Sequence, residues 1–113
     1  MPTIYKICTA PEWQAAESAG VYAGSAVDWQ DGYIHFSTGT QVAETAARYF
    51  AGMTDLVLVA VEADRFDAQL KWEPSRGGVL FPHLYGVLAV EAVLWVRPLP
   101  LDPAGRHKFP TLE

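Results

Sequence analysis

The chain has 113 residues, of which 50% are hydrophobic and 19% are charged, and its formal net charge is −5. This length and balance predict a single folded domain with a hydrophobic core and exclude an intrinsically disordered chain. The negative charge makes nucleic acid an unexpected partner, because phosphate binding depends on clustered lysine and arginine.

The cysteine content and the apolar runs indicate where the protein works. Cys8 is the single cysteine, which rules out an internal disulfide bond and suits a reducing compartment. The first residues contain no basic stretch followed by an apolar one, and no apolar run approaches the roughly 20 residues that cross a bilayer. We expect a small cytoplasmic protein with no membrane association, whose oligomeric state the sequence does not set.

The first elements in chain order are a strand and a helix. Residues 3–8, "TIYKIC", are rich in β-forming side chains. Thr9 and Glu12 have the spacing of a capping box, which predicts that a helix begins there. That helix turns Trp13 and Ala16 inward and ends at Gly20.

A loop rich in glycine, serine and aspartate then leads to a predicted strand at residues 33–37, "YIHFS". Side chains alternate across a strand, so Ile34 and Phe36 share the core face. Tyr33, His35 and Ser37 share the other face, which is either a wet surface or the wall of a site.

A second helix follows this strand. Thr38 and Gln41 repeat the capping-box spacing, and apolar residues between 42 and 53 recur at helical intervals. Gly52 is the expected end of this helix.

The second half of the chain reads mainly as strands. Residues 56–61, "LVLVAV", are apolar without alternation, as in a strand covered on both faces. Further strands are expected at 68–74, at 79–86 running into a loop, and at 90–96, with a turn at 75–78. Residues 98–113 are rich in proline and form a tail, laid on the surface or mobile. We therefore expect one α+β domain over residues 1–97, with a mixed or antiparallel sheet and two helices.

The candidate residues in the first half of the chain do not form a complete catalytic motif. His35 can bond a substrate hydroxyl or act as a general base, or it can be a strand histidine satisfied by a neighbouring carbonyl. Ser37 lies beside it. Lys6 is either an exposed residue on an edge strand or the border of a cleft. Cys8 is expected to be a small buried residue without nucleophilic character.

The segment from 70 to 86 is denser in aromatic and polar side chains. Trp72 and Tyr85 are large and flat, and Glu73 and His83 stand near them in sequence. Aromatic rings with a few convergent polar groups are typical of a small-molecule pocket. The alternative is that the rings are core and the polar groups cap loops. His35, Glu73 and His83 are chemically suitable metal ligands, but no paired spacing supports a metal site, and we assign none.

Several segments together resemble a known family. The order "IYKI", "YIHFST", "LVLVAVEADRF", "LKWEPS" and "FPHLYG" resembles small bacterial proteins catalogued as domain of unknown function 952, over residues 4–97. That family is similar to the ADP-ribosyltransferase-like superfamily, in the layout of the RNA 2′-phosphotransferases. The resemblance implies a compact split sheet around an NAD cleft. It places His35 at the second histidine of that cleft, matches Gly78 and Val79 loosely to a third motif, and leaves Lys6 where a first histidine is expected.

The function that the resemblance implies is binding of NAD or a related nucleotide, with divergent ADP-ribosyl transfer. In this hypothesis His35, Glu73 and His83 are catalytic, and Lys6, Ser37, Trp72 and Tyr85 hold the ligand. Breaking the nicotinamide–ribose bond builds positive charge on the ribose, for which Glu73 would supply an anion. Two alternatives stay open: a non-catalytic module that binds another small metabolite, and a structural or interaction domain.

Overall fold

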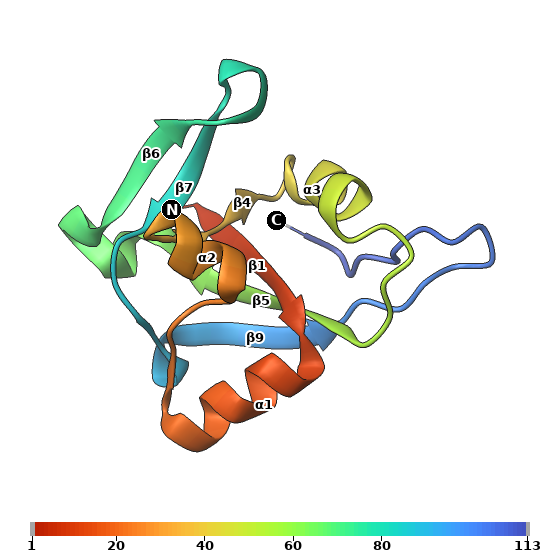
Figure 1. Cartoon of the computed structure of the whole chain (residues 1–113), viewed down its shortest axis with the longest axis horizontal. Helices are drawn as coiled ribbons and strands as arrows, with labels where there is room; N and C mark the ends of the chain where they lie inside the picture. The colour runs from red at the N-terminus through yellow and green to blue at the C-terminus, as the bar shows by residue number, and fades with distance from the viewer. Residues whose placement is uncertain (1, 113) are drawn as a thin grey trace.

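A four-stranded antiparallel sheet forms the centre of the computed structural model, which describes residues 2–112 (Figure 1). Its strands lie in the order β4 (Ser37–Thr38), β1 (Thr3–Thr9), β5 (Leu56–Glu62) and β9 (Val93–Pro98). β1 pairs with β5 along its whole length. β4 is short and pairs with β1 only at Ile4 and Tyr5, which leaves the rest of that edge of β1 without a strand partner in the described part of the chain.

Both faces of this sheet are buried, as predicted for residues 56–61. Side chains of β5 alternate between two core clusters: Val59 and Val61 belong to one, and Leu58 and Ala60 to the other. The helix α1 (Ala10–Ala19) begins at the capping box of Thr9 and Glu12 and contributes Trp13 and Ala16 to the first cluster, and Gly20 ends it; all of these were predicted. The helix α3 (Val42–Tyr49) contributes to the second cluster.

A second sheet contains β3 (Ile34–His35), β7 (Leu80–Leu84) and β6 (Leu70–Pro74), in that order. The predicted strand 33–37 is divided at Phe36: β3 pairs with β7, whereas β4 pairs with β1. The N–H of Phe36 donates to the carbonyl of Pro82 at 3.0 Å. One short run of chain therefore joins two sheets, which diverge on either side of it. Ile34 and Phe36 face the core as expected, each with 2% of its surface exposed.

The remaining elements are short. β2 (Val21–Tyr22) pairs with β8 (Leu88–Ala89), and 3₁₀ turns lie at η1 (Ala63–Gln69), η2 (Arg76–Gly78) and η3 (Val90–Ala92). All strand pairings of the described residues are antiparallel. The prediction of an α+β fold with an antiparallel sheet is confirmed.

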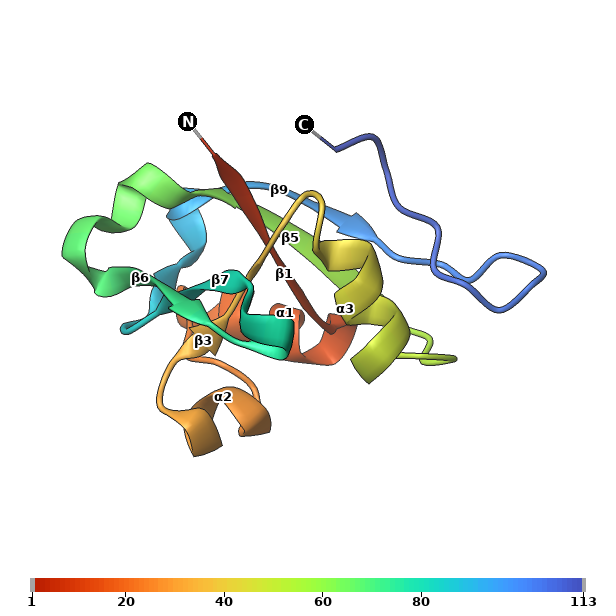
Figure 2. The ribbon, with the colours of Figure 1, turned by 90° about the horizontal axis from the view of Figure 1, so that it is seen from above.

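The expectation of two helices was wrong, because α2 (Ala26–Asp31) lies where a loop was expected. Asp28 accepts from the backbone N–H and the hydroxyl of Ser25, at 2.9 and 3.2 Å, and Gly32 ends the helix at φ 89°. Six residues are too few for an apolar periodicity to stand out, so capping and the left-handed glycine define this helix. Figure 2 shows α2 standing apart from the four-stranded sheet, near β3.

The end of α3 also differs from the prediction. The helix stops at Tyr49, and Phe50 leaves the helical region with φ −127° and ψ 15°, so Gly52 belongs to the turn that follows. The start differs as well: Gln41 is the N-cap in place of Thr38 and makes no side-chain capping bond, although its side chain accepts from the N–H of Thr38 at 3.0 Å. The same side chain donates to the carbonyl of Leu80 at 2.7 Å and so links α3 to β7.

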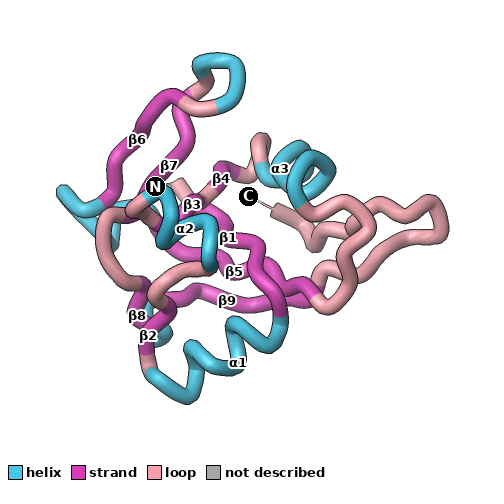
Figure 3. The backbone as a smooth tube through the Cα atoms, viewed as in Figure 1, coloured by secondary structure: helices cyan, strands magenta, loops and turns pink. Residues whose placement is uncertain are grey.

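The residues after β9 fold back along the loop that precedes β5 (Figure 3). Leu99 is buried in the second core cluster, where Phe109 and Leu112 pack against it. Nε2 of His107 lies 2.9 Å from the carbonyl of Met53. Within residues 2–112, no helix has the length and apolar character needed to cross a bilayer.

Candidate functional site

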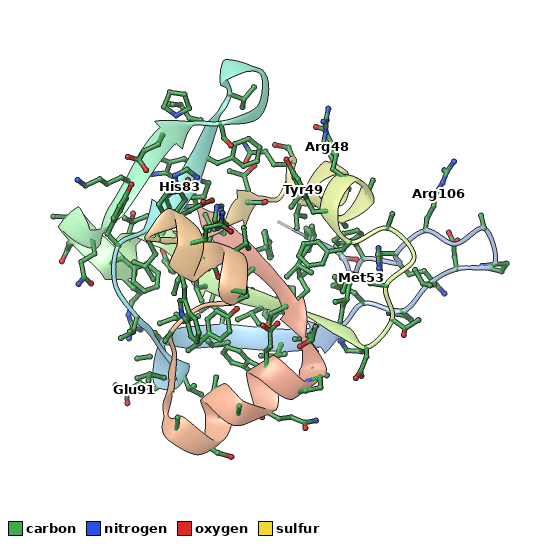
Figure 4. The ribbon with its side chains drawn as sticks, viewed as in Figure 1. Arg48, Tyr49, Met53, His83, Glu91 and Arg106 are labelled. Atoms are coloured by element: carbon green, nitrogen blue, oxygen red, sulfur yellow. The ribbon has the colours of Figure 1, made fainter. Side chains whose placement is uncertain are left out.

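A pocket of about 490 Å³ opens where the two sheets diverge. Part of its wall is the unpaired edge of β1 at Lys6 and Ile7, and other parts come from the start of α1, from α2, from α3 and from β7. Figure 4 shows Tyr49 extending from α3 on the side that faces the β6–β7 hairpin, where His83 lies. The lining residues are Tyr5, Lys6, Ile7, Glu12, Ser25, Val27, Asp31, Tyr33, His35, Phe36, Ser37, Thr45, Tyr49, Phe50, Ser75, Phe81 and His83.

Two histidines from distant parts of the chain meet in this wall. His35 of β3 and His83 of β7 are directly opposite in the strand pairing, and their ring centroids are 5.7 Å apart. Tyr33 lies against both rings: it stacks on His83 with centroids 4.0 Å apart and a 22° tilt, and its centroid is 4.7 Å from that of His35. The register of two strands therefore fixes an aromatic and imidazole wall.

Asp28 holds His35 in place through hydrogen bonds to its backbone and its ring. Its Oδ1 lies 2.6 Å from Nδ1 of His35 and accepts the backbone N–H of the same residue at 3.1 Å. Lys6 donates to both carboxylate oxygens of Asp28, at 3.0 and 2.8 Å. Asp28 and Lys6 are 2% and 5% exposed, so this is a buried ion pair that reaches the pocket through Lys6.

The charge of Asp28 is strongly stabilised. Burial alone would raise the pKa of this carboxyl, but the hydrogen bond from His35 and the charge and hydrogen bonds of Lys6 outweigh it and hold the pKa well below the ordinary value of 3.8. The carboxylate is therefore ionised at neutral pH and fixes Nδ1 of His35 as a donor.

The other nitrogen of His35 also faces a carboxylate. Nε2 lies 2.9 Å from Oδ2 of Asp31, the last residue of α2. A neutral imidazole carries one N–H and satisfies one of these two contacts, whereas the protonated ring donates to both. Both ring nitrogens of His35 therefore face a carboxylate, and 32% of its side chain is exposed.

His83 has a carboxylate on one side only. Nδ1 lies 2.8 Å from Oε1 of Glu73, and the hydroxyl of Tyr85 donates to the same oxygen at 2.7 Å. The hydrogen bonds from Tyr85 and His83 lower the pKa of Glu73, and the bond to Glu73 raises the pKa of Tyr85 to about 12. Because the ionised Glu73 accepts the Nδ1 proton, the neutral ring of His83 presents Nε2 as an acceptor.

The predicted site residues fall into three groups. His35, His83, Lys6 and Ser37 line the pocket. Glu73 and Tyr85 do not line the pocket but contact residues that do. Glu73 bonds to His83, and the ring centroid of Tyr85 is 5.3 Å from that of Tyr33. Trp72 is separate.

Trp72 points away because side chains alternate along β6. It is 41% exposed and lines a second hollow of about 240 Å³ beside Asp64, Asp67 and Leu70. Its neighbour Glu73 takes the opposite face and reaches His83.

The expectation that Lys6 is an exposed edge residue was wrong. At Lys6 the strand β1 pairs only with β5, but α2 covers the open side through Asp28, so Lys6 is buried with 5% of its surface exposed. Lys6 lines the pocket instead, in keeping with the other alternative, the border of a cleft. Cys8 is buried as expected, and burial raises the pKa of its thiol to about 12.

The sequence reasoning missed Asp28 and Asp31. Both belong to the segment that was expected to be a loop. The signal was present in the Ser25–Asp28 spacing, which is that of a helix N-terminus, and in Gly32 after it. Nothing in the spacing indicated that Lys6, 22 residues earlier, is the partner of Asp28.

Comparison with known proteins places this geometry in a family. A family model described as "Protein of unknown function (DUF952)" matches residues 7–96. The crystal structure of protein CC0527 from Caulobacter crescentus is 51% identical and superposes with a TM-score of 0.90, over 94% of this chain and 93% of that one. The solution structure of CC0527 is 52% identical, with a TM-score of 0.86, over 94% and 91% of the two chains. No curated protein matches the chain.

Proposed function

The chain belongs to the DUF952 family, and we propose that its pocket binds NAD or a related nucleotide through the ribosyl half and supports a divergent ADP-ribosyl transfer. One observation carries this proposal: two histidines, each with a carboxylate at Nδ1, share one wall of a single pocket. A volume of about 490 Å³ lies within the range typical of small-molecule sites. The divergence of the two sheets at Phe36, with the pocket between them, supports an ADP-ribosyltransferase-like layout.

The pocket supplies contacts for each part of a ribosyl ligand. Ser37 offers its hydroxyl to a ribose hydroxyl, and Nε2 of His83 accepts a hydrogen bond from the hydroxyl that attacks the ribose. Tyr33 presents a ring for a flat base, whereas Trp72 and Tyr85 were the aromatic residues expected to hold the ligand.

The transfer itself breaks the bond between the anomeric carbon of the ribose and the base nitrogen. The base leaves with the electron pair, and positive charge builds on the ribose. The carboxylates of Asp31 and Glu12 line the pocket and stabilise that charge, in the role first given to Glu73. The acceptor hydroxyl attacks the same carbon and gives its proton to Nε2 of His83.

The proposal assigns the site to residues 1–97. Residues 98–113 provide none of the described side chains that line the pocket. The proposed setting is the cytoplasm, where the buried thiol of Cys8 stays reduced.

Calorimetric titration with NAD and chromatographic detection of released nicotinamide test the two halves of the proposal. We expect saturable binding by the unaltered protein and its loss in His83→Gln. His107→Gln is the matched control, because His107 contacts Met53 and does not line the pocket. Absence of any binding at millimolar NAD or ribosyl nucleotide removes the proposed function, and binding without nicotinamide release removes only its catalytic half.

A second candidate function is a non-catalytic module for another small metabolite. It is favoured by the pairing of Lys6 with Asp28, which neutralises the lysine that would otherwise face a pyrophosphate. Thermal unfolding against a metabolite panel separates the two functions, since a ligand raises the midpoint with its concentration above Kd. A shift with a metabolite that lacks ribose, and none with NAD or nucleosides, selects this second function.

A further inference from the structure

His83 is the more enclosed of the two histidines in the pocket wall. It lies on the middle strand of the second sheet, opposite His35 of β3 on one side and Lys71 of β6 on the other. The ring of Tyr33 stacks on it with centroids 4.0 Å apart. Only 3% of the His83 side chain is exposed, against 32% for His35, although both rings line the pocket.

The ring of His83 has one nitrogen to offer to a ligand. Nδ1 lies 2.8 Å from Oε1 of Glu73, a residue that does not line the pocket. Nε2 has no hydrogen-bond partner among the residues that the structure describes. A polar atom on so enclosed a side chain usually has a partner, and here the pocket is where that partner comes from.

The enclosure of His83 limits the size of the group that can donate to Nε2. In the proposed transfer, the ribose, its base and the attacking hydroxyl share a pocket of about 490 Å³. A hydroxyl on a protein or a sugar chain brings its neighbouring atoms with it, and these must fit beside a ring that Tyr33 and His35 flank. A water molecule carries no such atoms and takes up only about 30 Å³ in the liquid.

We propose that the acceptor in this pocket is water, so that the protein hydrolyses the bond between ribose and base in NAD or a related nucleotide. This inference rests on the proposed function and names its acceptor. The bond between the anomeric carbon and the base nitrogen breaks, and the base leaves with the electron pair. The oxygen of water bonds to the anomeric carbon, and the proton of that water passes to Nε2 of His83, whose new charge Glu73 balances. With NAD the products are nicotinamide, ADP-ribose and one proton.

Chromatography of the products formed from NAD, with glycerol or a serine-containing peptide added in large molar excess, tests this acceptor. We expect nicotinamide and free ADP-ribose in equal amounts, with no ADP-ribose attached to glycerol, to the peptide or to the protein itself. His83→Gln should slow nicotinamide release by at least about 100-fold, which is the smaller contribution expected of a general base. His107→Gln should leave the rate unchanged, since His107 does not line the pocket.

The outcomes separate this inference from the proposed function. If nicotinamide exceeds free ADP-ribose and the difference is found on glycerol, the peptide or the protein, the acceptor is not water and the proposed transfer remains. If NAD binds and releases no nicotinamide, the catalytic half of the proposed function falls and this inference falls with it. Should His83→Gln fail to fold, the product ratio of the unaltered protein decides between these outcomes.

Discussion

Asp28 joins three separate parts of the chain at the scale of single residues. Its carboxylate holds Lys6 of β1, caps α2 through Ser25 and accepts from both the backbone and the ring of His35. Removing the charge leaves the ammonium of Lys6 buried without a counter-ion. We therefore expect Asp28→Asn to lower the free energy of unfolding by about 3–5 kcal/mol, measured by urea denaturation.

A second substitution distinguishes the lost ion pair from lost capping. In Lys6→Met with Asp28→Asn, no buried charge remains, so most of the stability should return. If the double variant is no more stable than Asp28→Asn alone, the ion pair is not the reason for the loss.

The same carboxyl predicts how stability depends on acid. The pKa of Asp28 is lower in the folded protein than in the unfolded chain, so the unfolded chain takes up its proton first as the pH falls. The stabilisation is complete above the ordinary pKa of 3.8 and is lost progressively below it. Urea midpoints between pH 6 and pH 2 should fall more steeply in the unaltered protein than in Asp28→Asn, and equal slopes would contradict this assignment.

His83 offers a prediction that concerns a single proton. Because Glu73 accepts from Nδ1, the neutral ring should carry its proton there and leave Nε2 bare. Nitrogen-15 chemical shifts of the ring report this tautomer directly, and Glu73→Gln should weaken the preference. A proton found on Nε2 in the unaltered protein would remove its proposed role as an acceptor.

At the scale of elements, the position of α2 depends on Gly24, where the backbone passes close to Asp28 of this helix. Gly24 has φ 111°, and a Cβ there would lie 2.9 Å from Cβ of Asp28. Gly32 has φ 89° but open space around it. Gly24→Ala should therefore destabilise the fold by more than Gly32→Ala, for which the left-handed backbone alone costs about 1 kcal/mol. Equal urea midpoints for the two variants would show that the contact with Asp28 is not important.

The sequence predicted the elements whose pattern is local. The capping box at Thr9 and the unbroken apolar run at 56–61 define α1 and β5 without help from distant residues. The break of the 33–37 strand at Phe36 was not predictable, because it depends on which half pairs with β1 and which with β7. The site was predictable in part, where the pattern is local: alternation along the strand places His35 on the pocket face. The contact between Asp28 and His35 depends on tertiary packing and could not be predicted.

The segment after β9 belongs to the stability of the whole molecule. Leu99 is 1% exposed within the second core cluster, so Leu99→Ala should cost about 2–5 kcal/mol in thermal or urea unfolding. Leu94→Ala is the control: Leu94 is 52% exposed, and its replacement should change stability by about 0.5 kcal/mol or less. Similar losses in both variants would contradict the packing of Leu99.

The division of the chain into a domain of residues 1–97 and a tail of 98–113 stays a prediction. A chain ending at residue 97 would lack Leu99, Phe109 and Leu112, which cover part of the second cluster. Comparing its unfolding with that of the full chain measures what the tail contributes.

The central claim is that His35 and His83 form one wall of a pocket that receives a ribosyl ligand. Nitrogen-15 resonances of the three histidine rings, followed during titration with NAD and with nicotinamide riboside, test it in one measurement. We expect the ring signals of His35 and His83 to shift together and saturably with at least one of these compounds, while the ring of His107 stays unchanged. Shifts confined to His107, or no shift of His35 and His83 at millimolar concentrations of both compounds, would contradict the account.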